Sequence, residues 1–367
     1  MPDNQPDIIK RRISMKKVIR TLLATSILAI SVQAAAETKV GFIYVGPKSD
    51  YGYNYAQEQG RLYLEEHMDD VETVYFENIP ENADVQRVME RMVRSGVEVV
   101  FPTSYGYLDH ALKVAEKYPD VHFAHSGGLK TSDNLMTYFA EIDQAMYLAG
   151  VAAGLTTGTN QLGFIAAHPI PQVLRNINAF TRGAQSVNPE VTTSVIWTSS
   201  WSDPTREAEA AEALISGGAD VLTGHVDSPI NYVQVAERRG VYSVGYHADA
   251  SQFAPKGWLV GAIWNWGPMM VNIVNSAKDG SWKSEHLRGD LLTEAAKLSD
   301  FGSAVSEEDQ QTVLDRREAI MNEELQVWAG PVFGQDGKVI VKEGDTMTLE
   351  ETEKMDFLVQ GVQGRLK

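Results

Sequence analysis

The chain of 367 residues contains no cysteine. It can therefore form no disulfide framework, and it offers no thiol for a lipid anchor after export. Basic residues are also scarce, with 32 Lys and Arg against 49 Asp and Glu and a net charge of -17. A surface that binds nucleic-acid phosphates needs clustered Lys and Arg, so this composition argues against a nucleic-acid partner. The length predicts about two domains.

The apolar run near the N-terminus, residues 22–32, is too short to span a membrane, which takes roughly 20 residues. The run has Lys16, Lys17 and Arg20 just before it and Ala34, Ala35 and Ala36 just after it. This order is typical of a secretory signal peptide. We expect cleavage near Ala34 to Ala36 and a soluble periplasmic product. Signal peptides usually begin with their basic residues, so the fourteen residues before Met15 are interpreted as an upstream extension, with the start at Met1 or Met15 left open.

Several catalytic motifs are absent from the sequence. It has no GxSxG nucleophile elbow, no HExxH metal motif and no GxxxxGK(S/T) phosphate loop. His122 and His125 are three residues apart, a spacing that directs them to opposite faces of a strand. We therefore expect a binding protein without a metal or cofactor, and not an enzyme.

One pattern of strands and helices occurs twice along the chain. Segments of the first copy recur in order in the second: 40–43 at 162–165, 57–66 at 180–189, 74–101 at 195–223 and 107–128 at 229–249. In each copy, short Val, Ile and Phe runs alternate with amphipathic helical patterns, which indicates βαβ units and a parallel sheet. The predicted fold class is α/β, with two doubly wound lobes. The first lobe is predicted from residues 37–142 plus about 268–325, and the second from 143–267 plus about 326–367.

Segments outside the repeats also have clear patterns. Residues 145–158 are rich in Ala and Gly, which predicts a closely packed helix. Residues 258–266 are apolar and predict a strand, followed by a helix to about Ala277. A charged helix is expected over 307–325, and 330–351 is expected to form a hairpin that turns at Asp336-Gly337.

The candidate site residues follow the predicted strands, because ligands of open parallel sheets bind beyond the carboxyl ends of the strands. The selected residues are Tyr53, Asn54, Ser104, Tyr105, Trp201, Asp227, His247, Asp249, Trp264 and Asn265. Aromatic rings and hydrogen-bonding side chains dominate this set. Stacking on an aromatic face contributes about 1–3 kcal/mol per base, so a planar heteroaromatic ligand such as a nucleobase is favoured. Asp227 and Asp249 have an alternative role in Asx turns, since both flank turns.

Several longer motifs carry a family resemblance. They are VGFIYVG, YLAGVAAGL, LGFIAA, RGAQSVNPEV, SSWSDPTREAEAAEALISGGADVL and VGYHAD, in that order. Together they resemble the basic membrane protein family of ABC-transporter substrate-binding proteins, a group that includes purine nucleoside receptors. The resemblance covers essentially the whole mature chain. It implies a type I periplasmic-binding-protein fold, with two lobes, several hinge strands and one ligand in the closed cleft. It also implies an inner-membrane ABC permease and its ATPase as partners.

The resemblance also implies roles for individual residues. The family's base-stacking aromatic near the first helix corresponds to Tyr53, beside Asn54. The aromatic before its Ser-Asp-Pro motif corresponds to Trp201, and a ligand-binding carboxylate corresponds to Asp227.

The second family carboxylate falls in the segment GYHAD, where Asp249 or His247 takes its role.

One position departs from the family pattern. Nucleoside-binding members carry a Lys followed by Asn, associated with the sugar, whereas this chain has Trp264 and Asn265. An indole removes a hydroxyl partner and fills volume, so the sequence favours a free purine base such as adenine over a nucleoside.

The resulting hypothesis is a monomeric extracytoplasmic receptor that closes on a purine base and delivers it to an ABC importer. A purine nucleoside receptor and a sensor subunit of the same fold are the alternatives within this class. A secreted nucleoside hydrolase is the alternative from another class.

Overall fold

The computed structural model describes residues 37–366. The predicted signal peptide, with its cleavage site and both possible start residues, lies outside the described residues. Within residues 37–366, no helix combines the length and the apolar character that crossing a membrane would require.

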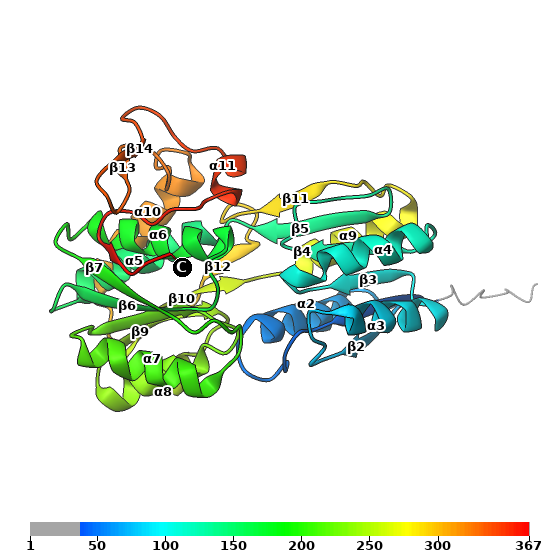
Figure 1. The fold of residues 1–367 in the computed structure, drawn as a ribbon, viewed down its shortest axis with the longest axis horizontal. Coiled ribbons are helices and arrows are strands. Elements are labelled where there is room, and N and C mark those ends of the chain that lie inside the picture. Colours follow the sequence, from blue (N-terminus) through cyan, green and yellow to red (C-terminus); the bar gives the residue numbers. More distant parts are fainter. Residues whose placement is uncertain (1–36, 367) are drawn as a thin grey trace, which may run out of the picture. The chain divides into compact units, whose positions relative to one another are not determined.

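The first lobe is built on a six-stranded parallel sheet with the strand order β11-β5-β4-β3-β1-β2 (Figure 1). Its strands are β1 (Thr38–Ile43), β2 (Val71–Phe76), β3 (Val99–Pro102), β4 (His122–Ser126), β5 (Leu135–Ala140) and β11 (His286–Gly289). Helices α2 (Tyr53–His67) and α9 (Gly267–Asp279) pack together on one face. Helices α3 (Ala83–Arg94) and α4 (Leu108–Lys117) pack together on the other, and the short helix η1 (Tyr105–Tyr107) precedes α4.

The second lobe contains a seven-stranded sheet with the order β12-β10-β9-β8-β6-β7-β15. Its strands are β6 (Gln161–Ala166), β7 (Thr192–Trp197), β8 (Val221–His225), β9 (Tyr242–His247), β10 (Trp258–Trp264), β12 (Ala296–Leu298) and β15 (Val362–Gln363). Only β12 runs antiparallel to its neighbour within this described sheet. Helices α5 (Ile142–Thr156) and α6 (Pro171–Gln185) pack together on one face, and α7 (Pro204–Ser216) and α8 (Ile230–Arg239) on the other (Figure 1).

The duplicated pattern is confirmed, because the recurring segments form corresponding strands and helices in the two lobes. The C-terminal part adds α10 (Glu307–Met321), α11 (Leu349–Glu353) and a hairpin of β13 (Val332–Phe333) and β14 (Val339–Val341). Gly337 has a φ of 75° in that hairpin, as the predicted turn requires.

The chain crosses between the lobes three times in the described part: after β5, after β10 and after β11. The last crossing changes the predicted division of the chain. Residues 268–325 were expected in the first lobe, but only α9 and β11 join that lobe. Strand β12 pairs with β10, and α10 packs on α5 in the second lobe. This stretch has no counterpart in the repeat, so the pattern gave no signal for the third crossing.

The Ala- and Gly-rich helix α5 packs very closely on α6, as its composition predicts. A Cβ atom at Gly150 would overlap the carbonyl oxygen of Phe180, and one at Gly183 would overlap that of Tyr147. These glycines allow the two helix backbones to touch. The contact fixes α6, whose N-terminal end reaches the cleft between the lobes.

Candidate functional site

A cavity lies between the lobes. The carboxyl ends of the two sheets face each other at this place (Figure 1). First-lobe residues on one side are Tyr53, Ser104, Tyr105, Ser126 and Phe139; second-lobe residues on the other are Gln172, Trp201, His225, Asp227, Tyr246, His247 and Trp264. Most of these side chains directly follow a strand or end it, so sheet geometry alone brings them together.

Tyr53 enters the cavity from the first turn of α2. Its hydroxyl donates to the carbonyl oxygen of Thr103 at 2.6 Å and lies 2.7 Å from Oγ of Ser126. Burial raises the pKa of Tyr53 and keeps the phenol neutral. The ring meets the His247 ring edge-on, with centroids 5.5 Å apart. Tyr53 therefore presents a fixed aromatic surface across the boundary between the lobes.

Asp227 follows β8 and is buried with few polar partners. Nδ2 of Asn54 donates to its Oδ2 at 3.5 Å, whereas Oδ1 of Asn54 is buried and has no hydrogen-bond partner in the described structure. Burial raises the pKa of Asp227 well above its ordinary value, and the charges of Asp50 and Glu207 raise it further. A carboxyl group in this setting gains from any ligand that supplies hydrogen-bonding groups to it.

His247 and His225 are held as neutral rings of defined tautomer. Nδ1 of His247 accepts from Nε1 of Trp264 at 2.9 Å, so Nε2 carries the hydrogen and donates to the carbonyl oxygen of Val226 at 3.1 Å. Nδ1 of His225 likewise accepts from Nδ2 of Asn176 at 3.0 Å. Burial lowers the pKa of His247 well below its ordinary value and that of His225 to about 3. Neither ring brings a positive charge to the cavity.

Two indoles supply flat surfaces on the second-lobe side. The half-buried Trp201 contacts His168 edge-on, with centroids 5.0 Å apart. Trp264 is buried and stacks on Trp266, with centroids 4.5 Å apart and an angle of 19° between the rings. Phe139 of the first lobe is tilted against Trp264 at 5.0 Å. The cavity thus combines aromatic faces with a buried carboxyl group.

Residues 37–329 match the family model described as "ABC transporter substrate-binding protein PnrA-like", the Bmp family. The chain belongs to the Bmp family. The family match agrees with the sequence motifs that resembled the basic membrane proteins. Substrate-binding proteins of ABC importers act outside the cytoplasm and present a small-molecule ligand to a membrane permease and its ATPase.

Two curated relatives of this Bmp protein are 38% identical to it. A purine-binding protein of Brucella abortus aligns over 95% of this chain and 99% of its own length. A putative ABC transporter glucose-binding protein of Haloferax volcanii aligns over 89% of this chain and 80% of its own.

Solved structures of solute-binding proteins share the fold of this Bmp protein. One from Aeropyrum pernix has a TM-score of 0.70 at 18% identity, over 80% of this chain and 94% of that chain. One from Conexibacter woesei has a TM-score of 0.66 at 21% identity, over 79% and 98%. The predicted type I periplasmic-binding-protein fold is confirmed.

Seven of the ten predicted site residues line the cavity of this Bmp protein: Tyr53, Ser104, Tyr105, Trp201, Asp227, His247 and Trp264. Asn54 lies directly behind them, bonded to Asp227. Asp249 is exposed, and its Oδ1 accepts from the backbone N–H of Ser251 at 2.8 Å. Asn265 does not line the cavity either, because neighbouring residues of an extended chain point to opposite sides and Trp264 points inward.

Five cavity residues were not selected from the sequence: Ser126, Phe139, Gln172, His225 and Tyr246. Ser126, His225 and Tyr246 end predicted strands, so strand position could have identified them. Gln172 lies in the first turn of α6, and Phe139 near the end of β5. These two come from elements that had not been considered as part of the cleft.

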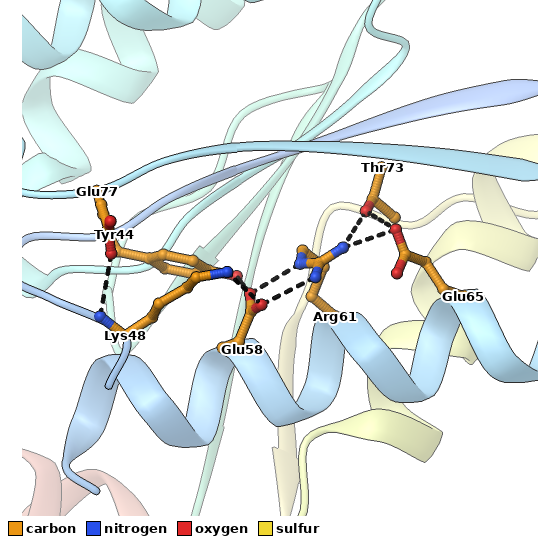
Figure 2. Close-up of polar contacts among 7 residues, drawn as sticks. All are labelled: Tyr44, Lys48, Glu58, Arg61, Glu65, Thr73 and Glu77. Atoms are coloured by element: carbon orange, nitrogen blue, oxygen red, sulfur yellow. Dashed lines mark hydrogen bonds and ion pairs between the residues drawn. The ribbon is translucent and has the colours of Figure 1, made fainter. Parts of the chain in front are cut away.

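The loop between β1 and α2 is fixed by a network around Glu58 (Figure 2). Glu58 accepts from the hydroxyl of Tyr44 at 2.9 Å, from Nζ of Lys48 at 2.8 Å and from two nitrogens of Arg61 at 2.7 and 2.8 Å. Burial would raise the pKa of Glu58, but hydrogen bonds from Arg61 and Lys48 lower it overall. Nζ of Lys48 also lies 3.8 Å above the ring centroid of Tyr75. The first half of the loop, from Tyr44 to Lys48, is therefore attached to α2 and β2 of the first lobe.

Proposed function

We propose that the cavity binds a purine nucleobase, with adenine as the first candidate, and that the protein delivers it to an inner-membrane permease. The observation that supports this is the combination of flat rings with a buried, incompletely paired carboxyl group. Proposed ligand-binding residues are Tyr53, Asn54, Ser104, Tyr105, Trp201, Asp227, His247 and Trp264. The name of the Brucella abortus relative is consistent with this class of ligand.

The ring faces would supply affinity and the polar groups would supply selectivity. Stacking on Trp201 or Trp264 contributes about 1–3 kcal/mol per base. Asp227 can accept hydrogen bonds from N–H groups on the edge of the ring, and Asn54 behind it holds its Oδ2. A ligand without these donors would leave buried oxygens unpaired, which is the situation that gives strong discrimination in polar sites.

The proposed transport cycle uses closure of the lobes around the ligand. A ligand shifts the balance between open and closed forms only if it binds the closed form more tightly. Contacts from both lobes satisfy this condition, since Tyr53 comes from one lobe and Asp227 and Trp201 from the other. We propose that the protein acts as a periplasmic monomer.

Titration calorimetry of the mature protein, after removal of bound ligand by unfolding and refolding, tests the proposal. Adenine, guanine, adenosine and glucose are compared. We expect adenine to bind and Trp201→Ala to weaken its binding by about tenfold or more. Trp282→Ala is the matched control, because Trp282 packs on His122 in the first lobe and does not line the cavity.

The other outcomes separate the alternatives. Tighter binding of adenosine than of adenine would make the protein a nucleoside receptor. Binding of glucose alone would contradict the purine proposal. Release of free base from adenosine by the purified protein would instead support a hydrolase.

A further inference from the structure

The lobes also touch at a place outside the ligand cavity, in the loop before α2. Oγ of Ser228 in the second lobe donates to Oδ2 of Asp50 in the first at 2.6 Å. The ring of Tyr51 meets that of Phe253 edge-on, with centroids 5.1 Å apart and an angle of 80°. Phe253 ends the short helix η2 (Ser251–Phe253) of the second lobe. We call Asp50, Tyr51, Ser228 and Phe253 the lip contacts.

Backbone atoms of the two lobes meet beside the lip contacts. The N–H of Tyr53 donates to the carbonyl oxygen of Asp227 at 3.3 Å. A Cβ atom at Gly52 would overlap that same oxygen, so only glycine permits this approach. The lip is therefore fully closed in this structure.

The lip contacts lie away from the segments that connect the lobes. Those connections follow β5, β10 and β11, and β5 and β11 lie at one edge of the first sheet. The lip loop follows β1, which is separated from β5 by β3 and β4 in the sheet order. A hinge rotation about the connections moves distant points most, so opening of the cleft must separate the lip contacts.

Tyr51 is held in a conformation that non-glycine residues rarely adopt. Its φ is 56°, in the left-handed region, and its ring stacks on Tyr55 with centroids 4.6 Å apart. Such a conformation persists only where the surroundings favour it. The three neighbouring tyrosines thus have different positions: Tyr53 faces the cavity, Tyr51 faces the opposite lobe and Tyr55 supports Tyr51.

We propose that the lip contacts form a latch that stabilises the closed cleft without touching the ligand. No lip residue lines the cavity. The latch rests on the proposed function only in that the cleft closes on a ligand, and the identity of the ligand does not matter to it. Loss of the latch weakens the binding of every cavity ligand by one common factor, because it changes only the open–closed balance.

Distances between spin labels on the two lobes test the latch in ligand-free protein. The natural chain lacks cysteine, so Lys113→Cys on α4 and Glu209→Cys on α7 give two defined, exposed attachment sites. Pulsed electron paramagnetic resonance then reports the populations of short and long distances. Phe253→Ala and Ser228→Ala are expected to move the distribution towards the long distance, with a two- to tenfold fall in the ratio of closed to open forms.

Matched controls make the same chemical changes elsewhere. Phe333→Ala alters an exposed ring on the C-terminal hairpin, and Ser276→Ala removes a hydroxyl that bonds Ile273 within α9. Both controls should leave the distances unchanged. Tyr51→Asn removes the ring but retains a residue type that tolerates the left-handed backbone, and it should act like Phe253→Ala.

An unchanged distance distribution in the lip variants overturns the latch, and so does a parent protein that is already fully open without ligand. Adenine calorimetry on the same proteins adds a second readout, in which the lip variants should raise Kd by the factor seen in the distances. If adenine fails to bind but the distances shift, the purine proposal fails and the latch stands.

Discussion

Glu207 is a buried carboxyl group whose ionisation should control how stability depends on pH. It lies in α7 and is fully shielded from solvent. Its carboxylate accepts from the N–H of Asp203 at 3.0 Å and from Nδ2 of Asn231 at 2.6 Å. Burial raises the pKa of Glu207 to about 7, against those hydrogen bonds, and the charge of Asp50 raises it further.

The direction of the effect follows from linkage between protonation and folding. The folded protein holds the proton of Glu207 more tightly than the unfolded chain, whose pKa is about 4.5. Stability from this group is therefore complete below about pH 4.5 and is lost as pH rises to about 7. At 1.36 kcal/mol per pKa unit, the loss is about 3 kcal/mol. The glutamine of Glu207→Gln cannot ionise, so this variant should not lose that stability as the pH rises.

Urea unfolding of wild type and Glu207→Gln at a series of pH values from 4.5 to 8 measures this difference. We expect the variant to gain about 3 kcal/mol of unfolding free energy relative to wild type across that range. Glu209→Gln is the matched control, since Glu209 is an exposed residue of the same helix, and it should follow the wild type. Parallel pH curves for wild type and Glu207→Gln would refute the reasoning.

Two further substitutions test the packing within and between the lobes. Gly150→Ala should lower the free energy of unfolding by roughly 1–3 kcal/mol, because the added methyl group would overlap the Phe180 backbone. Gly158→Ala is the control in thermal unfolding, because a methyl group at Gly158 meets no such crowding. Glu353→Gln should lower the free energy of unfolding in urea by roughly 1.5–3 kcal/mol, because it removes the charge paired with Arg288 at 2.6 Å. An equal loss of unfolding free energy in an Arg288→Met background would show that the ion pair contributes nothing.

The sequence predicted the architecture well because the same pattern of strands and helices occurs twice along the chain. Two copies of each strand and helix gave two independent signals, and their shared order indicated facing sheets. The single-copy region after α9 gave only one weak signal, and there the lobe division differed. The segment 290–298 leaves the first lobe for the second because β12 pairs with β10. That pairing is a long-range contact, which local periodicity does not encode.

The candidate site was predicted by chain position, and side-chain direction explains which of the predicted residues do not line the cavity. Position after a strand selected Trp201, Asp227 and Trp264, and these three residues line one cavity. It could not show that Asp249 bonds to its own turn or that Asn265 lies outside the cavity. Those outcomes depend on local twist and turn geometry, which become visible only in three dimensions.

The short C-terminal strand β15 lies beyond the family match, which ends at residue 329. Val362 and Gln363 pair with Thr193 and Ser194 of β7. Without them, β7 would offer unpaired amide and carbonyl groups to any passing extended chain. Val362 and Gln363 therefore cover part of the β7 edge of the second sheet and protect it from pairing with another chain. This role is separate from ligand binding.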